Sequence, residues 1–194
     1  VGTVGLFLFS LLVFAQPLVA LWENAMYEDP IVHQEQSIYQ SIVLTKRGEQ
    51  IRLFLNGHLQ FASVDEFRYH EALVHPAMVL SNTRERILII GGGDGLTARE
   101  VLKYPDVETV DLVDLDPAVT RLATQNYYLT ALNDNALSRP EVQVHHADGL
   151  SFLQEERQAY GVIIFDLPDP REEGLAKLYS REGYRLAKRV LSPG

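Results

Sequence analysis

The hydrophobic positions at the start of the chain form one unbroken apolar stretch. Residues 1–21 carry no charge, and a helix of that length, at about 1.5 Å rise per residue, would cross a hydrocarbon core of roughly 30 Å. Pro17 would kink this helix, which membrane helices tolerate better than soluble ones. We therefore predict a transmembrane helix over residues 1–27, with Trp22 and Tyr27 as interfacial anchors. A signal peptide and a buried soluble helix are the alternatives.

A polar segment follows, and after it the pattern changes to short apolar runs. Residues 28–36 begin with Glu-Asp-Pro and are mostly polar, which is typical of a linker. Runs with the length and composition of strands lie at residues 40–46, 50–55 and 58–61. Asn56-Gly57 joins the last two and is strongly favoured in two-residue hairpin turns. We predict a small antiparallel sheet and assign residues 28–62 to a linker and a small N-terminal β-domain.

From Ser63 onward, helix and strand patterns alternate. Ser63 and Glu66 have the spacing of a capping box, which predicts a helix over residues 64–78, with Pro76 disturbing its end or kinking it. Further strands are predicted at residues 87–90, 109–116, 142–146 and 160–165, and helices at residues 96–104 and 118–126. Short connections and right-handed crossovers between such elements predict an α/β domain with a doubly wound parallel sheet over residues 63–194.

The strand at residues 87–90 runs directly into Gly91-Gly-Gly-Asp-Gly95. Its four apolar residues do not alternate with polar ones, as expected of a parallel strand covered on both faces. Glycines allow positive φ and close backbone approach, so a flat or anionic ligand can lie against this turn and the following helix N-terminus. Such turns occur in many nucleotide and nucleoside sites and also as plain tight turns. The glycine motif alone leaves both interpretations open.

Carboxylates stand at the ends of the three later strands, at Asp114, Asp148 and Asp166. Ligands in doubly wound sheets bind beyond the carboxyl ends of the strands, so these acids and the glycine turn converge on one crevice. Asp114 lies about twenty residues after the glycines, where an acid can accept hydrogen bonds from a ribose. Asp116, followed by Pro117, is instead predicted to cap the next helix.

The loop after the last predicted strand combines two acids with two prolines. Pro168 and Pro170 stiffen the loop that carries Asp166 and Asp169. Rigid carboxylates beside a bound ligand suit the capture and deprotonation of an amine. The alternative is that Asp169-Pro170 forms only a turn.

The charge balance narrows the classes of partner. The formal net charge of −9 argues against nucleic acid, because phosphate contacts need clustered Lys and Arg. The same charge suits a cationic partner such as a polyamine. The absence of Cys excludes disulfides and thiolate metal sites, and the six His residues lack the H-E-x-x-H spacing. We assign His145 and His146 to a strand end.

The order of these motifs resembles the polyamine aminopropyltransferases, of which spermidine synthase is the type. The matching residues are Tyr39-Gln40, Leu53 to Gly57, Gln60-Phe61, Asp65-Glu66, Tyr69-His70-Glu71, His75-Pro76, Gly91 to Gly95, Arg99-Glu100, Asp148-Gly149 and Asp166 to Pro170. With the apolar stretch before them, they resemble the subgroup in which an integral-membrane region precedes the synthase domain. The chain begins at Val1 and stops at Gly194, where that fold should enter its fifth strand, so we expect truncation at both ends and an uncovered fourth strand.

The resemblance implies a Rossmann-like fold of the methyltransferase type after a small β-domain. It also implies transfer of an aminopropyl group from the co-substrate, decarboxylated S-adenosylmethionine, to putrescine or a related polyamine, giving spermidine and methylthioadenosine. Neither a metal nor a tightly bound cofactor is implied. Family members usually form dimers or tetramers. We expect a homo-oligomer at the bacterial inner membrane, with its catalytic domain in the cytoplasm.

By the resemblance, residues from both domains hold the nucleoside donor. Gln40 and Asp114 would contact the ribose. Asp148 would bind the adenine amino group, and Asp94 would bind the aminopropyl ammonium of the donor. The glycines of the donor site are Gly91, Gly93, Gly95 and Gly149. The family usually has Glu at the ribose position, where this chain has the shorter Asp114.

The resemblance assigns the acceptor chemistry to the loop after the last strand. Asp166 would act as general base, helped by Tyr69, whereas His70 and Asp169 would line the acceptor site. An amine with a pKa of about 10 is protonated at neutral pH, so a carboxylate must take its proton before it can attack the methylene beside the sulfonium. The family's usual Asp-Ser-Ser-Asp-Pro is Asp-Leu-Pro-Asp-Pro here. Because Tyr69, His70 and Glu71 are consecutive on a helix, at least one of them must face solvent or serve structure.

Two other functions share parts of this pattern. An S-adenosylmethionine-dependent methyltransferase has the same sheet and glycine turn, but it must bind the methionine carboxylate, which Asp94 would repel. A membrane-anchored domain that binds a nucleoside or a polyamine could keep the pocket without catalysis. The presence of both Asp166 and Asp169 favours an enzyme over such a binding domain.

Overall fold

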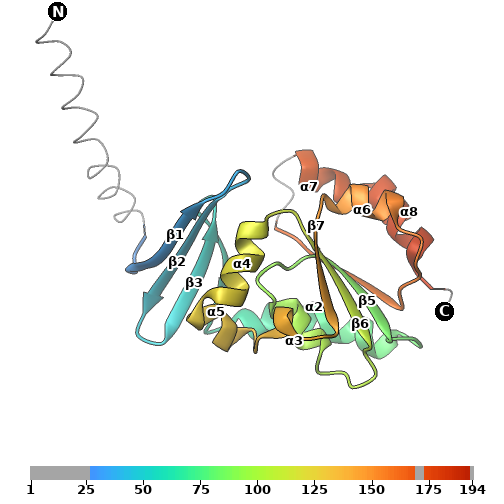
Figure 1. The fold of residues 1–194 in the computed structure, drawn as a ribbon, viewed down its shortest axis with the longest axis horizontal. Coiled ribbons are helices and arrows are strands. Elements are labelled where there is room, and N and C mark those ends of the chain that lie inside the picture. Colours follow the sequence, from blue (N-terminus) through green and yellow to red (C-terminus); the bar gives the residue numbers. More distant parts are fainter. Residues whose placement is uncertain (1–26, 169–172, 193–194) are drawn as a thin grey trace, which may run out of the picture. The chain divides into compact units, whose positions relative to one another are not determined.

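The computed structural model describes residues 27–168 and 173–192 (Figure 1). The chain divides, between Ala62 and Ser63, into two compact units. The predicted transmembrane helix lies, apart from Tyr27, outside the described residues. Within the described ranges, no helix combines the length and apolar character needed to cross a membrane.

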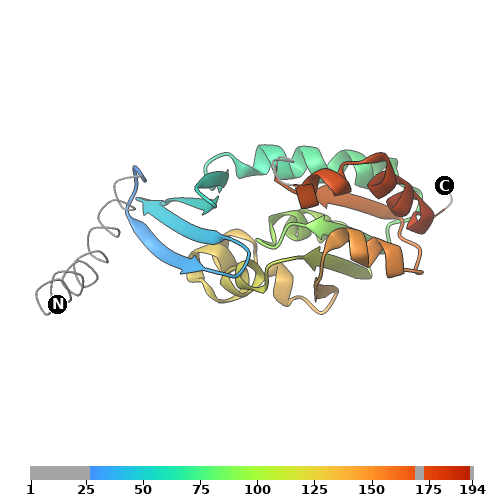
Figure 2. The ribbon, with the colours of Figure 1, turned by 90° about the horizontal axis from the view of Figure 1, so that it is seen from above.

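The first unit is a four-stranded antiparallel sheet (blue to teal in Figure 2). Its strands, in sheet order, are β1 (Ile31–Gln36), β2 (Ser41–Arg47), β3 (Gln50–Leu55) and β4 (His58–Ala62). Strands β2 to β4 confirm the three strands predicted from the sequence. Asn56 and Gly57 have φ values of 50° and 75°, the two positive values that a type I′ hairpin turn requires.

The strand β1 corrects the prediction of a polar linker before the sheet. It pairs antiparallel with β2, and its residues alternate between half-buried and exposed positions. The sequence hid this alternation because two of the half-buried side chains, His33 and Glu35, are polar. Just before β1, the buried carboxylate of Asp29 pairs with Arg47 and, at 3.0 Å, with Arg52. The segment is therefore fixed to the sheet by charge as well as by main-chain hydrogen bonds.

The second unit is a four-stranded parallel sheet with its connecting helices. Its strands, in sheet order, are β7 (Val142–His146), β6 (Thr109–Asp114), β5 (Arg86–Gly91) and β8 (Val162–Asp166). The helices are α2 (Glu66–Leu80), α3 (Leu96–Val101), α4 (Pro117–Gln125), α5 (Tyr127–Leu132), the short 3-10 helix η1 (Ala136–Ser138), α6 (Gly149–Glu155), α7 (Glu173–Leu178) and α8 (Arg181–Val190). After α8 the chain returns to the sheet, where Leu191 forms a parallel bridge with Tyr160, just before β8.

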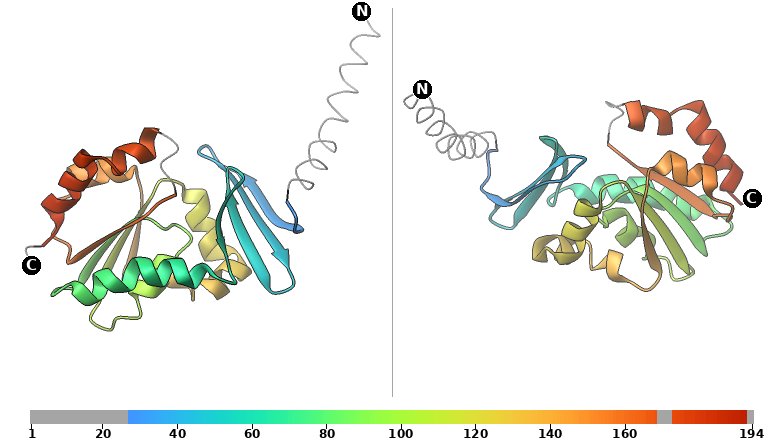
Figure 3. Two further views of the ribbon diagram at one scale, coloured as in Figure 1. Left: turned by 180° about the vertical axis from the view of Figure 1, so that it is seen from behind. Right: turned by 45° about the horizontal axis from the view of Figure 1, so that its top comes forward.

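Helices cover both faces of this sheet, with α2 (green) on one side and α7 and α8 (red) on the other (Figure 3). Ile87 and Ile89 of β5 pack in one core with residues of α2 and α3. Leu88 and Ile90 pack in a second core with residues of α6, α7 and α8. The unbroken apolar run of β5 follows from this double coverage. The predicted doubly wound parallel sheet is confirmed.

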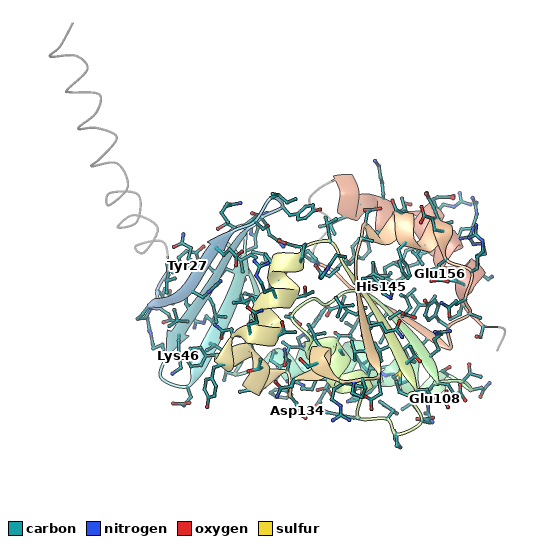
Figure 4. The ribbon with its side chains drawn as sticks, viewed as in Figure 1. Tyr27, Lys46, Glu108, Asp134, His145 and Glu156 are labelled. Carbon is teal, nitrogen blue, oxygen red and sulfur yellow. The ribbon has the colours of Figure 1, made fainter. Side chains whose placement is uncertain are left out.

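A polar network lies within the core on the α6–α8 face. Asp111, buried in β6, accepts hydrogen bonds from His145 Nε2 at 2.8 Å and from the Tyr160 hydroxyl at 3.1 Å. The Tyr160 hydroxyl also lies 3.2 Å from Glu156 Oε2; His145 and Glu156 are labelled in Figure 4. Because buried polar groups need partners, this network supports the sheet. His145 lies in β7, and its place at the end of a strand agrees with the prediction.

The helix α2 begins at Glu66, two residues later than predicted. Its N-cap is Asp65, not the predicted serine, and the Asp65 side chain makes no capping hydrogen bond. The Glu66 carboxylate is buried and bonds to Arg99 and His70. Glu66, which the sequence pattern predicted to be part of a helix cap, instead forms an internal ion pair with Arg99. The helix also continues past Pro76 and ends at Leu80.

Replacing Ile89 with Ala tests the contribution of the central strand to stability. Ile89 is fully buried, and large-to-small substitutions of this kind cost about 2–5 kcal/mol of unfolding free energy. Val79→Ala on α2 is the control, because Val79 is 68% exposed and should change stability by less than about 0.5 kcal/mol. Urea unfolding of the intact natural protein, followed by circular dichroism, measures both variants. Equal losses of unfolding free energy in the two variants would contradict the burial of Ile89 in the core.

Candidate active site

The glycine turn between β5 and α3 brings the ends of β5 and β8 into close contact. Gly91 and Gly92 have φ values of 87° and 68°, a conformation that other residues rarely adopt. The Gly92 N–H donates to the main-chain oxygen of Asp166 at 3.0 Å. A Cβ on Gly91 would lie only 1.9 Å from that same oxygen. These glycines therefore place Asp166 directly beside the turn.

Asp114, at the end of β6, is held by two main-chain donors. Its Oδ2 accepts from the Gly93 N–H and its Oδ1 from the Asp116 N–H, both at 2.9 Å. Burial raises the pKa of the Asp114 carboxyl despite these hydrogen bonds. Each carboxylate oxygen keeps a further lone pair with which it can accept a ligand hydroxyl. Asp116 caps α4 by accepting from the Ala118 N–H at 2.9 Å, which confirms its predicted role.

Asp94 occupies the glycine turn at the start of α3. Its Oδ1 accepts from the Leu96 N–H at 2.9 Å, and its main-chain oxygen accepts from the Asn133 side-chain amide at 2.8 Å. Burial and the nearby charge of Asp166 raise the pKa of Asp94 to about 6, and His70 opposes this shift. An acid whose charge is disfavoured in this way gains most from a positively charged partner.

The Asp166 carboxylate accepts a hydroxyl hydrogen bond on each of its oxygens. Tyr69 on α2 donates to Oδ1 at 3.1 Å, and Thr97 on α3 donates to Oδ2 at 2.6 Å. Burial and the charge of Asp166 raise the pKa of Tyr69, so its hydroxyl stays protonated and remains a donor. Thr97 is fully buried. Two helices together therefore set the position of this one carboxylate.

His70 lies in a compact cluster with Asp94 and Asp166. One ring nitrogen of His70 and one carboxylate oxygen of each aspartate lie within 4.8 Å of one another. His70 is buried, whereas the next residue, Glu71, is exposed. Tyr69 and His70 thus both contribute to the site, and Glu71 faces solvent. This confirms that three consecutive helical residues do not share one face.

Two carboxylates and an imidazole at this spacing suit a positively charged ligand, either ammonium groups or a metal ion. A second group in the described part of the chain, Glu71, His75 and Glu100, is equally close, with ligand atoms within 4.8 Å of one another. The buried Glu100 already pairs with Arg99 at 2.9 Å and with Lys103 at 2.5 Å. Since those two cations neutralise Glu100, the cluster at Asp94 and Asp166 is the better cation site.

Asp148 and Gly149 lie at the start of α6, directly after β7. Asp148 is exposed, and its Oδ1 accepts from both the main-chain N–H and the hydroxyl of Ser151, at 2.8 Å and 2.9 Å. Within the described residues, no hydrogen bond joins Asp148 to Asp94, Asp114 or Asp166. A Cβ on Gly149 would lie 2.7 Å from Ile90 Cγ2, so the small size of this glycine lets α6 pack against β5.

Comparison with known proteins decides the family. The model of the spermine/spermidine synthase domain matches residues 66–194, about two thirds of the chain. The chain belongs to this family. The predicted resemblance is therefore confirmed, and so is the Rossmann-like architecture that the resemblance implied.

Individual members of the synthase family are similar over nearly the whole chain. A polyamine aminopropyltransferase of Oceanobacillus iheyensis is 50% identical over 192 residues, which cover 99% of this chain and 38% of that protein. The polyamine aminopropyltransferase of Mycobacterium tuberculosis is 42% identical over 188 residues, covering 95% of this chain and 35% of its own length. The chain therefore spans little more than a third of the length of these relatives.

Two solved spermidine synthases share the fold. One, in complex with the transition-state analogue AdoDATO, has a TM-score of 0.77 and 31% identity, and the match covers 84% of this chain and 55% of that one. The synthase of Thermotoga maritima has a TM-score of 0.75 and 32% identity, with coverage of 84% and 54%. These values extend the family likeness from sequence to three-dimensional structure.

The predicted synthase site is thus assembled in part by the described residues. The glycine turn, Asp94, Asp166, Tyr69 and His70 come together, as the contacts above show. Asp114 joins the glycine turn through the Gly93 N–H. Gln40 lies between β1 and β2 in the first unit, where its main-chain oxygen accepts from the Ser37 N–H at 2.9 Å. Asp169 lies outside the described residues, so its predicted role is untouched by the structure.

Sequence reasoning missed several residues that hold this predicted site in place. Thr97 and Asn133 bond directly to Asp166 and Asp94, and the pair Glu66 and Arg99 lies behind His70. Thr97 follows the glycine motif by two residues, so a hydroxyl in the first turn of α3 was the available signal. Asn133 had no such signal, because its contact with Asp94 spans 39 positions of sequence.

Replacing Gly93 with Ala tests the contact between the turn and Asp114. Unlike Gly91, Gly92 and Gly95, Gly93 does not have a positive φ, so only the contact with Asp114 opposes a side chain. A Cβ there would lie 2.4 Å from Asp114 Oδ2. It should displace the carboxylate, break its hydrogen bond, and lower the free energy of unfolding by about 1–3 kcal/mol.

A double-mutant cycle supplies the control. In an Asp114→Ala background the clash is gone, so Gly93→Ala should cost much less than it does alone. Urea unfolding of the four proteins gives the coupling energy. Strictly additive costs would show that the two residues do not interact.

Proposed function

We propose that the protein transfers an aminopropyl group from decarboxylated S-adenosylmethionine to putrescine or a related polyamine. The observation that carries this proposal is the pair of carboxylates, Asp94 and Asp166, held together with His70 at the carboxyl edge of the sheet. Both substrates are cationic, so each finds a counter-charge in this acidic site. Family membership and relatives named polyamine aminopropyltransferases support the same reaction.

For the donor, we assign the aminopropyl ammonium to Asp94 and the ribose hydroxyls to Asp114. Gly91, Gly93 and Gly95 would let the nucleoside approach the backbone of the turn. Gln40 would add a second ribose contact, and Asp148 with Gly149 would meet the adenine. Asp148 keeps one oxygen free of the Ser151 contacts, which supports its use as an acceptor from an amino group.

For the acceptor, we assign the base to Asp166, with Tyr69 holding its carboxylate and His70 and Asp169 lining the site. The substrate ammonium gives one proton to the carboxylate and becomes a neutral amine. Its nitrogen lone pair then attacks the methylene beside the sulfonium, the carbon–sulfur bond breaks, and its electron pair stays on sulfur as methylthioadenosine leaves. Since the sulfonium is a good leaving group, positioning the two substrates supplies much of the acceleration.

We propose further that residues 1–27 anchor the protein in the bacterial inner membrane and that the synthase unit faces the cytoplasm. The uncharged run over residues 1–21 supports the anchor. The absence of Cys suits a reducing compartment. We also propose a homo-oligomer, on the family resemblance. None of these three points affects the chemistry assigned to Asp94 and Asp166.

The decisive assay uses the intact natural protein with putrescine and each of two donors. Release of methylthioadenosine with decarboxylated S-adenosylmethionine is the expected result. Methyl transfer from S-adenosylmethionine would instead identify a methyltransferase, which the negative charge of Asp94 disfavours. Binding of the nucleoside without turnover of either donor would identify a binding domain.

Within that assay, Asp166→Asn should lower turnover by about 100-fold or more while leaving donor binding largely intact. The reason is that the amide cannot take up the proton of the acceptor amine, and general base catalysis contributes roughly 10²–10⁴-fold. Asp134→Asn is the matched control, since Asp134 is exposed and its left-handed backbone suits Asn equally well. Turnover that survives in Asp166→Asn would refute the assignment of the base.

The protonation of Asp94 gives a pH dependence. Its pKa is raised to about 6, so the carboxyl loses its charge as the pH falls through that value. We expect kcat/KM for the donor to fall below about pH 6, by up to roughly tenfold per unit, because kcat/KM reports the free enzyme. In Asp94→Asn, kcat/KM should be low throughout and this limb should be absent. Initial rates at low donor concentration measure the profile, and a limb that persists in the variant would assign it to another group.

A further inference from the structure

The Glu66 carboxylate lies buried between the site and a cation behind it. Arg99 donates to Glu66 Oε1 through one guanidinium nitrogen at 2.9 Å and to Oε2 through the other at 3.0 Å. On its other side, His70 Nδ1 lies 2.8 Å from Glu66 Oε2. Burial opposes the charge of Glu66, but the bonds to His70 and Arg99 prevail and lower its pKa. Glu66 is therefore an ionised carboxylate that only accepts hydrogen bonds.

These contacts fix the tautomer of His70. The same Nδ1 lies 2.8 Å from the main-chain oxygen of Glu66. Both of its neighbours are acceptors, so Nδ1 must carry a hydrogen. In the neutral ring the lone pair is then on Nε2.

Because Glu66 engages Nδ1, we assign Nε2 of His70 as the nitrogen that serves Asp94 and Asp166. Nδ1 is engaged by Glu66, and the ring lies within the 4.8 Å cluster with Asp94 and Asp166. The groups that face His70 are Glu66 on its own helix, Asp94 from the glycine turn and Asp166 from β8, with the ring of Tyr69 at 5.0 Å. Burial lowers the pKa of His70, but the bond to Glu66 and the charges of the two aspartates raise it overall.

The proposed reaction leaves a proton on Asp166 that must depart before the next turnover. Tyr69 and Thr97 cannot take it, because both already donate their hydroxyl hydrogens to that carboxylate. Asp94 is committed to the ammonium of the donor. Among the described residues that face Asp166, the neutral imidazole, with its Nε2 lone pair, is the acceptor that remains.

We propose that Nε2 of His70 receives the proton that Asp166 takes from the amine, and that Glu66 and Arg99 are positioning residues that hold the imidazole for this transfer. The proposal rests on the aminopropyl transfer proposed above. In this step the carboxylic acid of Asp166 becomes a carboxylate and the imidazole becomes an imidazolium. The proton passes to solvent after product release.

Glu66→Gln is the informative variant, because it keeps the size of the side chain and removes its charge. Without that charge the imidazolium is less stable, so the pKa of His70 should fall by about one unit. The acid limb of the kcat profile that His70 controls should move to lower pH by the same amount. On the plateau above this limb, kcat should fall by up to about tenfold, because a less basic imidazole takes the proton less readily, with little change in the KM of either substrate. Glu71→Gln, an exposed neighbour on the same helix, is the matched control and should leave the profile unchanged.

A second measurement does not depend on turnover. Nitrogen-15 NMR of the His70 ring in the intact protein should show Nδ1 protonated and Nε2 unprotonated above its pKa. In Glu66→Gln this tautomer should persist, because the main-chain oxygen of residue 66 still accepts from Nδ1, but the pKa of the ring, titrated by the same signals, should fall. His70→Gln, which cannot carry the proton, should lower kcat by about 100-fold. Thermal unfolding confirms that each variant is folded.

The outcomes separate this inference from the proposed function. If the protein transfers aminopropyl groups but Glu66→Gln leaves both the pH profile and the pKa of His70 measured by NMR unchanged, the inference fails and the function stands. A loss of kcat in Glu66→Gln with an unmoved pH profile would likewise reduce Glu66 to a structural role. If no donor is turned over, the function fails and the proton transfer fails with it, while the NMR result still decides whether Glu66 raises the pKa of His70.

Discussion

The close approach of β5 and β8 at Gly91 and Gly92 is the constraint on which the site depends. The hydrogen bond from Gly92 to the main chain of Asp166, and a space at Gly91 too small for a side chain, bring two strand ends within contact. Because α3 starts only a few residues after this turn, Thr97 reaches the Asp166 carboxylate. Doubly wound sheets generally have a crevice at the carboxyl ends of their strands. In this protein the backbone contact between Gly92 and Asp166 places two acids, Asp94 and Asp166, in that crevice.

That pair is electrostatically unfavourable without a ligand. Asp94 and Asp166 share a partly buried space. The pKa of Asp94 is raised both by its burial away from water and by repulsion from the charge of Asp166. His70 offsets part of it, and main-chain and hydroxyl donors offset more. A positively charged ligand would relieve this repulsion on binding. The acidity that is costly to folding is therefore the property that selects the ligand.

The local patterns in the sequence predicted the elements of the fold well and their long-range contacts less well. The parallel strands, the hairpin at Asn56-Gly57 and the cap at Asp116 were predictable, because apolar runs and turn residues act locally. The strand β1 was missed because polar residues occupy its half-buried positions. Glu66 has the sequence spacing of a cap but pairs with Arg99, 33 positions away. The contacts of Thr97 and Asn133 were missed for the same reason, since sequence spacing does not reveal which distant strand end a side chain will meet.

The helix α2 combines tasks that are usually spread over several elements. Its polar residues include Tyr69, which orients Asp166, and His70 with its partner Glu66, whereas Val74 and Met78 of the same helix are fully buried in the core. The packing of these two apolar side chains in the core therefore sets the position of Tyr69 and His70 on the same helix. A displacement of reacting groups by about 1 Å can cost roughly 100-fold in rate. A conservative change in this core would therefore reduce the proposed catalysis well before it unfolds the protein.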